Sequence, residues 1–439
     1  MKSFRQLAAT SLATITLFGA SAGLAETNPT GERVFNRECS VCHHSKGNGD
    51  GPLAELLDPR PRNFIDGLYK LRSTPSGELP TDADLIKTVT NGMPGTGMPS
   101  FRHLGAETIK KVVAHLKTLG GPEGEEGSWF DLYEIPPPIT VPAPPAVGAE
   151  DKARGAKLYV DMGCDGCHGK TGRGDGKPPQ ELIDNWGRPL HPRSFHMGVF
   201  KGGSRPEDLY TRIMTGLDGT PMTAFWKDVL SPDERWILVR YVTSFGRPRR
   251  VEQPSSGTIE VSRGVGPASV DSGAWEGVEA TRVLRMPLSG GWIRYFEPLE
   301  LRAMVAQGSL ALRLSWDDGD AGCQALRVVF PADARSEATF GLGSEDARVR
   351  VWQWREGEQP AVFDSSGPGS EVAVDAKIAV YSGKDGSRRK LVMSGEVPAG
   401  ASRLLLMVSG CSGGEDYLTA STFYDLEPPA PLSAEEDEK

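Results

Sequence analysis

The stretch CSVCHHSKGNGDGP, residues 39–52, contains a C-x-x-C-H string followed by a glycine-rich turn. A second stretch, CDGCHGKTGRGDGK at residues 164–177, repeats the pattern. C-x-x-C-H is the attachment signature of c-type haem, in which both thiols bind the porphyrin covalently. Taken alone, each stretch also allows two alternatives: half of a zinc site, or a redox-active dithiol.

The two stretches belong to a longer internal repeat. The first unit opens with GERVFNRECSVCHH at Gly31 and the second with GAKLYVDMGCDGCHG at Gly155. Both units continue through a Gly-x-Gly-Asp-Gly turn to the matched tetrapeptides PRNF (61–64) and PRSF (192–195). A zinc site needs four nitrogen or sulfur ligands close together, whereas each unit supplies only a cysteine pair and one or two histidines. The repeat therefore favours one covalent haem in each unit.

Both units end in a segment with helical periodicity. In AETIKKVVAHLKTL (106–119) the apolar residues fall on one face of a helix. In SPDERWILVRYVTSF (231–245), Ser231 is predicted to cap the helix, with Pro232 at its first position and Glu234 completing a capping box.

The predicted proximal iron ligand is the histidine that follows each second cysteine, because the thioether bonds place its imidazole beneath the iron. These ligands are His43 and His168. Covalent attachment is predicted at the two cysteine pairs, Cys39, Cys42, Cys164 and Cys167.

The repeat also serves as an internal alignment for the distal ligands. Aligning TNGMPGTGMPSF with MTGLDGTPMTAF places Met98 opposite Met222, at nearly the same distance from the proximal histidine. Met93 falls opposite Leu217, which cannot bind iron. Met98 and Met222 are therefore the predicted distal ligands, and Met93 is interpreted as a packing residue.

An N-terminal helix, C-x-x-C-H, a glycine-rich loop, a methionine loop and a C-terminal helix occur in this order at residues 30–120 and 150–246. This arrangement resembles that of class I cytochromes c. The resemblance implies two all-α domains, each with a covalently bound haem c. It also implies a proline carbonyl beside the proximal imidazole, a place that Pro52 fits and that Pro178 fits after a one-residue shift.

The arginines of the two matched tetrapeptides, Arg62 and Arg193, are candidate partners for the haem propionates. A guanidinium group suits a carboxylate because it can donate two parallel hydrogen bonds. The alternative is that both are ordinary surface arginines.

The N-terminal segment has the layout of a secretory signal peptide, with Lys2 and Arg5 ahead of an apolar stretch that ends in small residues near Ala25. Export to the periplasm suits covalent haem attachment and disfavours a cytosolic dithiol. No later stretch is long and apolar enough to cross a bilayer. The formal charge of −9 argues against nucleic acid and favours a partner with a basic docking surface.

The third part of the chain changes character after about residue 258. Short runs such as SLALRLSW, ALRVVF and ARVRVWQW are separated by turn residues, which predicts an antiparallel β-sandwich or barrel. The fold expected for the whole chain is therefore two all-α domains followed by an all-β sandwich domain. The expected organisation is a signal peptide 1–25, α domains 26–121 and 151–247 joined by a proline-rich linker 122–150, a β domain 258–428 and an acidic tail 429–439.

The β domain resembles the haem-binding domain of the ethylbenzene-dehydrogenase gamma-subunit family, with LSWDD and VWQW as the better markers. The resemblance implies a b-type haem held by a methionine and a lysine, in subunits that serve molybdenum enzymes of the dimethyl-sulfoxide-reductase type. The expected methionine is replaced by Leu342 in FGLG, so we expect no third haem here. Four methionines elsewhere in the domain are interpreted as packing residues: Met286, Met304, Met393 and Met407.

Two further cysteines, Cys323 and Cys411, lie in the β domain. Export makes a disulfide between them the favoured interpretation, and a pair of buried thiols is the alternative.

The leading functional hypothesis is a periplasmic dihaem c-type cytochrome without catalytic activity of its own. It would exchange electrons with a redox protein or a molybdenum enzyme, and the β domain would serve for docking. The alternative is a dihaem enzyme of the peroxidase or thiosulfate-oxidising type, which needs an open or exchangeable position on one iron. A haem-dependent sensor ranks last, because the sequence contains no recognisable output domain.

Overall fold

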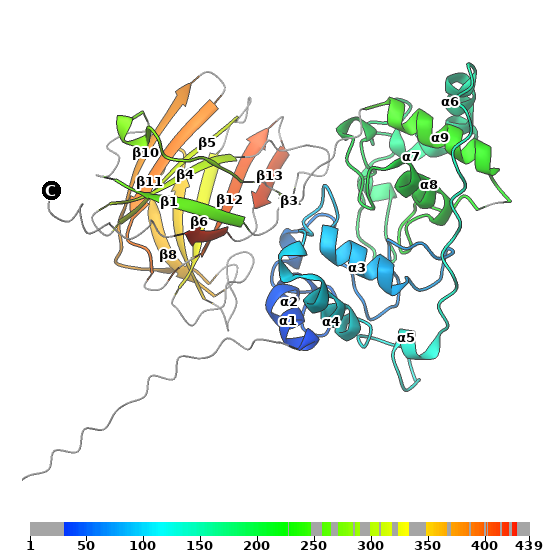
Figure 1. Cartoon of the computed structure of the whole chain (residues 1–439), viewed down its shortest axis with the longest axis horizontal. Coiled ribbons are helices and arrows are strands. Elements are labelled where there is room, and N and C mark those ends of the chain that lie inside the picture. Colours follow the sequence, from blue (N-terminus) through cyan, green and yellow to red (C-terminus); the bar gives the residue numbers. More distant parts are fainter. Residues whose placement is uncertain are drawn as a thin grey trace, which may run out of the picture.

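The computed structural model describes residues 30–226, 228–246, 257–264, 271–283, 286–289, 299–306, 309–317, 324–332, 348–366, 370–385, 388–398, 401, 403–412, 415–420 and 424–427. The predicted signal peptide and acidic tail lie outside these ranges, as do Cys323, Leu342 and the side chain of Cys411. The disulfide prediction therefore falls outside the described part of the chain. Figure 1 shows a helical N-terminal region and a β-rich C-terminal region, which confirms the predicted division.

The helical region contains two units and a linker. The first unit comprises α1 (Gly31–Glu38), α2 (Ser40–His43), η1 (Ala54–Leu56), α3 (Asp82–Asn91), η2 (Arg102–Leu104) and α4 (Ala106–Leu116). The linker contains α5 (Trp129–Leu132). The second unit comprises α6 (Asp151–Asp161), α7 (Cys164–His168), η3 (Pro179–Glu181), η4 (Phe195–Met197), α8 (Pro206–Thr215) and α9 (Pro232–Ser244). In the described part of the chain, no helix has the length and apolar character needed to span a membrane.

In each unit the first long helix packs against the last, and a glycine lies at the crossing. A Cβ atom on Gly31 of α1 would lie 2.0 Å from the carbonyl oxygen of Lys111 in α4. On Gly155 of α6 it would lie 2.7 Å from the Cβ of Tyr241 in α9. Any larger side chain would push the helices apart, so the glycine that opens each unit sets the approach of its two helices.

The last helix of each unit follows the sequence pattern. The apolar face predicted for residues 106–119 is buried in α4, at Ile109, Val112, Val113 and Leu116. The Ser231–Glu234 capping box of α9 is present, with Pro232 at the first helical position. Both predictions are confirmed.

The linker lies along both units. The Trp129 indole donates to the carbonyl of Ile65, and the Ile139 amide donates to the carbonyl of Ser73, so the linker is bound to the first unit. Further along, the Trp236 indole of α9 donates to the carbonyl of Pro142. The Ile139 amide and the Pro142 carbonyl lie in the extended part of the linker after α5, where no helical hydrogen bond occupies them.

The β-rich region contains the strands β1 (Gly257–Arg263), β2 (Thr281–Val283), β3 (Met286–Ser289), β4 (Leu299–Ala306), β5 (Ser309–Asp317), β6 (Gln324–Pro331), β7 (Val349–Arg355), β8 (Ala361–Ser365), β9 (Val372–Ala373), β10 (Ile378–Asp385), β11 (Arg388–Gly395), β12 (Arg403–Ser412), β13 (Glu415–Ala420) and β14 (Tyr424–Glu427). A short helical turn, η5 (Gly273–Trp275), precedes β2.

The described strands form one hydrogen-bonded path in the order β10-β11-β5-β4-β1-β14-β12-β6-β7-β8-β9, with β2 on β4, β13 on β12 and β3 on β13. The pairings are antiparallel except that β1 pairs in parallel with β14 and β4. Strands from both halves of this path contribute to a single apolar core, which contains Trp316, Phe330 and Trp352. The antiparallel prediction therefore holds for most pairs, and the parallel strand β1 joins the two halves.

One half of the β-rich region is buried on both of its faces. Successive side chains of a strand point to opposite faces, so Val328 and Trp352 lie in the main core whereas Val329 and Val351 face outward. The outward face packs against the first helical unit, through Leu57 and Cys42. It includes Val349, Phe363, Leu405 and Met407. The β-rich region is thus part of the surroundings of the first C-x-x-C-H string.

Candidate haem-binding sites

The first unit surrounds an open cavity with about 1180 Å³ of empty space, including the part open to solvent. The C-x-x-C-H string, mostly in α2, supplies Cys39, Cys42 and His43 to its lining. Met93 and Met98 line it from the loop between α3 and η2. The structure therefore brings the predicted proximal and distal ligands to one cavity.

The second unit surrounds a corresponding cavity with about 1550 Å³ of empty space. Helix α7 supplies Cys164, Cys167 and His168 to its lining, and the loop after α8 supplies Leu217 and Met222. Leu217 occupies the place that Met93 has in the first cavity, as the internal alignment predicted.

The two methionine loops share the same backbone geometry. The Met93 amide donates to the Met98 carbonyl at 3.1 Å, and the Leu217 amide donates to the Met222 carbonyl at 3.0 Å. In each loop a threonine hydroxyl, Thr96 or Thr220, accepts from the amide of the predicted ligand at 3.2 Å. These matched bonds place Met98 and Met222 at equivalent positions.

Each predicted proximal histidine is held by a backbone carbonyl. The Nδ1 atom of His43 lies 2.9 Å from the carbonyl oxygen of Arg62, and that of His168 lies 3.1 Å from the carbonyl oxygen of Arg193. Burial lowers the pKa of His43 to about 4 and also lowers the pKa of His168. A neutral imidazole whose Nδ1–H donates to a carbonyl keeps the Nε2 lone pair for a metal.

The carbonyl partners differ from those expected. The resemblance to class I cytochromes c assigned this position to Pro52 and Pro178, but both prolines are exposed. The carbonyls come instead from the residue after a later proline, in the PRNF and PRSF tetrapeptides. The phenylalanine that ends each tetrapeptide, Phe64 or Phe195, stacks on the histidine ring at 4.7 Å or 4.5 Å between centroids.

The four cysteines of the two strings are half-buried, and three of them have a raised thiol pKa. Burial raises the pKa of Cys42 to about 12 and that of Cys164 to about 11, and it also raises the pKa of Cys39. Redox-active dithiols have a lowered thiol pKa, so these values argue against that alternative. Among the residues that the structure describes, no group of three or more His, Cys, Asp or Glu side chains is placed to hold a metal ion. The zinc alternative therefore gains no support.

Two segments of the chain, residues 26–116 and 150–242, match the family described as cytochrome C oxidase, cbb3-type, subunit III. Both helical units are of the cytochrome c type. A curated relative is the Cbb3-type cytochrome c oxidase subunit FixP of Azorhizobium caulinodans, which is 30% identical over 106 residues. The match covers 24% of this chain and 31% of FixP, so the chain spans about a third of that relative's length.

Among solved structures, a chain of the Kuenenia stuttgartiensis reducing HAO-like protein complex Kustc0457/Kustc0458 is 40% identical. The match covers 51% of this chain and 98% of that chain, with a TM-score of 0.47. Domains of the cytochrome c type hold covalently bound haem c, in keeping with the two C-x-x-C-H helices.

At the interface, each cytochrome c domain contributes one arginine that donates a hydrogen bond to the methionine loop of the other domain. Arg62 of the first domain donates to the carbonyl of Asp218, in the methionine loop of the second, at 3.5 Å. Arg193 of the second domain donates to the carbonyl of Gly95, in the methionine loop of the first, at 3.1 Å. Arg62 also lies over the ring of Trp186, 4.4 Å from its centroid. Each arginine thus connects the proximal histidine of its own domain with the distal loop of the other.

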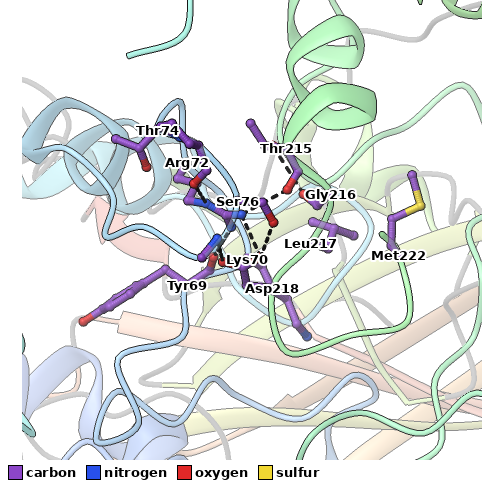
Figure 2. A network of polar contacts seen from close by, with 12 residues as sticks. Tyr69, Lys70, Arg72, Thr74, Ser76, Thr215, Gly216, Leu217, Asp218 and Met222 are labelled. Carbon is purple, nitrogen blue, oxygen red and sulfur yellow. Dashed lines mark hydrogen bonds and ion pairs between the residues drawn. The ribbon is translucent and has the colours of Figure 1, made fainter. Parts of the chain in front are cut away.

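A buried ion pair strengthens the same interface. Figure 2 shows Arg72 of the first domain directed at Asp218, a few residues before Met222. The guanidinium donates to the Asp218 carboxylate at 2.7 Å and to the carbonyl of Thr215 at 3.0 Å. It also donates to the carbonyl of Tyr69 at 3.0 Å. The arginine side chain is fully buried, so these bonds compensate the cost of removing its charge from water.

Two lysines that the sequence analysis missed belong to the same region. Lys70 lines the first cavity, and Lys201 lines both cavities. They occupy matched positions in the repeat, because PRNF continues to GLYK and PRSF continues to GVFK. Extending the internal alignment past the tetrapeptides would have found them.

Proposed function

We propose that this chain is an exported electron-transfer protein with one covalently bound haem c in each cytochrome c domain. In the first domain Cys39 and Cys42 attach the haem, and His43 and Met98 bind its iron. In the second domain Cys164 and Cys167 attach the haem, and His168 and Met222 bind its iron. The observation that carries the proposal is the presence of two matched cavities, each with a C-x-x-C-H helix and an equivalent methionine loop in its wall.

The residues present suit such a group. The cavity linings are largely apolar, and each contains a neutral histidine held at Nδ1 and a thioether sulfur. A bound haem supplies a one-electron iron couple, whose potential a His/Met ligand pair raises. The protein's own residues orient the imidazole, fix the methionine loop and exclude water. Two side-chain ligands leave no iron position for a substrate, which favours electron transfer over the peroxidase or thiosulfate-oxidising alternative.

The partner is proposed to be a periplasmic oxidoreductase with a basic docking surface. The acidic balance of the chain supports this choice. The curated relative is a subunit of an oxidase, in keeping with a role as one subunit of a larger redox assembly. The resemblance of the β-rich region to the ethylbenzene-dehydrogenase gamma subunit makes a molybdenum enzyme of the dimethyl-sulfoxide-reductase type the partner to test first.

We propose no haem for the β-rich region. Met304, Met393 and Met407 are each buried in an apolar cluster, where packing accounts for them. This part of the chain instead supports the first cytochrome c domain and offers further surface to a partner.

The test is expression of the whole chain in a periplasm that matures c-type cytochromes. Intact mass should show the polypeptide from Glu26 plus two haems, and acid–acetone should extract none of them. Oxidised protein should show the near-infrared band of methionine–iron ligation and no shift of the Soret band with cyanide. A single covalent haem, or none, contradicts the proposal. Rapid cyanide binding at one haem would favour the enzyme alternative, and an additional extractable haem would locate a haem b in the β-rich region.

A further inference from the structure

Four basic residues lie where the two cavities approach each other. Arg62 and Lys70 come from the first cytochrome c domain, and Arg193 and Lys201 from the matched positions of the second. Arg62 and Lys70 line the first cavity, and Arg193 lines the second. Lys201 lines both. We call these four residues the interdomain cation cluster.

Three members of the cluster, Arg62, Lys70 and Lys201, have donor atoms without a hydrogen-bond partner among the described residues. The Nη1 atom of Arg62 is buried without a hydrogen-bond partner among the described residues. The Lys70 side chain is only 8% exposed, and burial holds its pKa well below the ordinary lysine value. Burial also lowers the pKa of Lys201 to about 7. Neither lysine ammonium forms a hydrogen bond or an ion pair with any residue in the described ranges.

Asp58, Asp66, Asp184 and Asp218 lie close enough to raise the pKa of Arg62, Lys70 or Lys201, but none of them forms an ion pair with these three residues in the described ranges. Asp58 lies 3.1 Å from Nδ1 of His191. Asp218 forms the ion pair with Arg72, and Asp184 accepts from the backbone amide of Trp186 at 2.9 Å. Arg62, Lys70 and Lys201 therefore line two apolar cavities without a direct ion-pair partner among the described residues, and Arg193 lines the second cavity beside Lys201.

Buried cations of this kind need anionic partners, because an unpaired charge removed from water is strongly destabilised. A haem group carries two propionate carboxylates at one edge of its ring. Haems in both cavities would thus bring as many carboxylates as the cluster has cations. Guanidinium groups bind carboxylates through parallel hydrogen bonds, and lysine ammonium groups act as compact point charges.

We propose that the interdomain cation cluster is a single carboxylate-binding site shared by the haems of the two domains, with Lys201 as the residue common to both. The inference rests on the proposed function, because it requires haem in both cavities. It adds that the carboxylates of both haems would be held by residues at the interface between the two domains. A shared positive charge at this place stabilises the reduced state of both irons and so raises both potentials.

The experiment is a spectroelectrochemical titration of the whole holoprotein with Lys201→Gln. The expected result is a shift of both midpoint potentials to lower values, because one charge near both haems has been removed. Lys201→Arg should keep both potentials close to those of the wild type. Lys70→Gln should mainly lower the potential of the first domain, since Lys70 lines only that cavity.

The matched control is Lys152→Gln, which removes a lysine from the exposed surface of α6. Solvent and salt screen this charge, so its removal should shift both potentials by less than Lys201→Gln does. The potentials are assigned to domains with a variant that lacks the first cysteine pair and therefore the first haem.

The outcomes separate this inference from the proposed function. A wild-type protein without two covalent haems contradicts the proposed function itself. With both haems bound, a shift of only one potential in Lys201→Gln shows that the site is not shared, and no shift beyond that of Lys152→Gln overturns the inference. If Lys201→Gln fails to retain haem, Lys201→Arg decides: retention of both haems supports a charge-based role, and loss of haem in this variant too overturns it.

Discussion

The two cytochrome c domains have matched cavities, but different parts of the chain pack beside the C-x-x-C-H string of each domain. In the first domain, Leu57 and Cys42 pack against the outward face of the β-rich region. In the second domain, the residue at the matched place is Leu182, which also follows a short helical turn and is also 6% exposed. Its carbonyl accepts from the amide of Leu190, in an insertion that the first domain lacks.

The insertion of the second domain does more than cover its own cavity. Residues Ile183 and Pro189 form a β-bridge, which closes a turn. From this turn the Trp186 indole donates to the carboxylate of Asp66, and Arg188 lies 3.2 Å from the carboxylate of Asp50, both in the first domain. The first domain is therefore covered at Leu57 by the β-rich region, whereas the second is covered at Leu182 by its own insertion. The domains should therefore respond differently to equivalent changes.

The largest expected effect is the loss of one haem from one domain. The double change Cys39→Ser and Cys42→Ser should remove one haem mass from the intact protein, and Cys164→Ser and Cys167→Ser should remove the other. Because Cys42 also packs against the β-rich region, the first variant should in addition lower the melting temperature of that region. If both variants lower the melting temperature of the β strands equally, the β-rich region does not depend specifically on the first domain.

The next effect concerns the distal ligands. Met98→Ala and Met222→Ala should each remove about half of the near-infrared methionine–iron band and lower one midpoint potential, because a weakly donating thioether is lost. Met93→Ala should leave the band in place, as Leu217 does naturally in the second domain. Loss of the band in Met93→Ala, with retention in Met98→Ala, would show that the two domains use different loop positions.

Local patterns in the sequence were enough to locate the C-x-x-C-H strings and the methionine loops and to predict the apolar face of α4. These features depend on neighbours in the chain, which a repeat displays twice. The reach of Arg62 to Asp218 was not predictable, because it depends on how two folded surfaces meet. The same holds for the packing of Leu57 on the β strands. Lys201, by contrast, can be found from the sequence, because it matches Lys70 in the repeat. Its position in the lining of both cavities is known only from the structure.

The interface between the two domains should be sensitive to the buried ion pair. Arg72→Gln leaves the Asp218 carboxylate without its buried partner, and a change of this kind costs roughly 3–5 kcal/mol of folding free energy. Because Asp218 belongs to the loop that carries Met222, the methionine–iron band of the second haem should weaken first on heating. Thermal unfolding followed at that band tests the order of loss, and chemical denaturation gives the change in folding free energy.

The control for this ion pair is Lys110→Gln, which removes an exposed partner of Glu107 within α4. Exposed pairs of this type contribute little to stability, because water and salt screen them. If both variants lose a similar folding free energy, the buried Arg72–Asp218 pair stabilises the protein no more than an exposed pair does.

The smallest expected effect comes from a matched pair of leucine substitutions, which compares the packing at Leu57 with that at Leu182. Leu57→Ala removes a buried side chain between the first domain and the β strands, which should cost about 2–4 kcal/mol. Leu182→Ala is the matched change in the second domain, where the covering insertion belongs to the domain itself. Both variants should lose stability by a similar amount, because both side chains are equally buried. The two variants should differ in which part of the molecule becomes easier to unfold.

Hydrogen exchange followed by mass spectrometry can locate that part of the molecule. In Leu57→Ala, the amides of β6, β7 and β12 should exchange faster, because the outward face of these strands loses an apolar contact and local opening becomes easier. In Leu182→Ala, faster exchange should be confined to α7 and the 183–190 insertion. If Leu57→Ala leaves the β strands unchanged, the β-rich region does not depend on the first cytochrome c domain, and its contact with Leu57 is incidental. If both variants accelerate the β strands, the whole molecule unfolds as one unit, and the two covers are energetically equivalent.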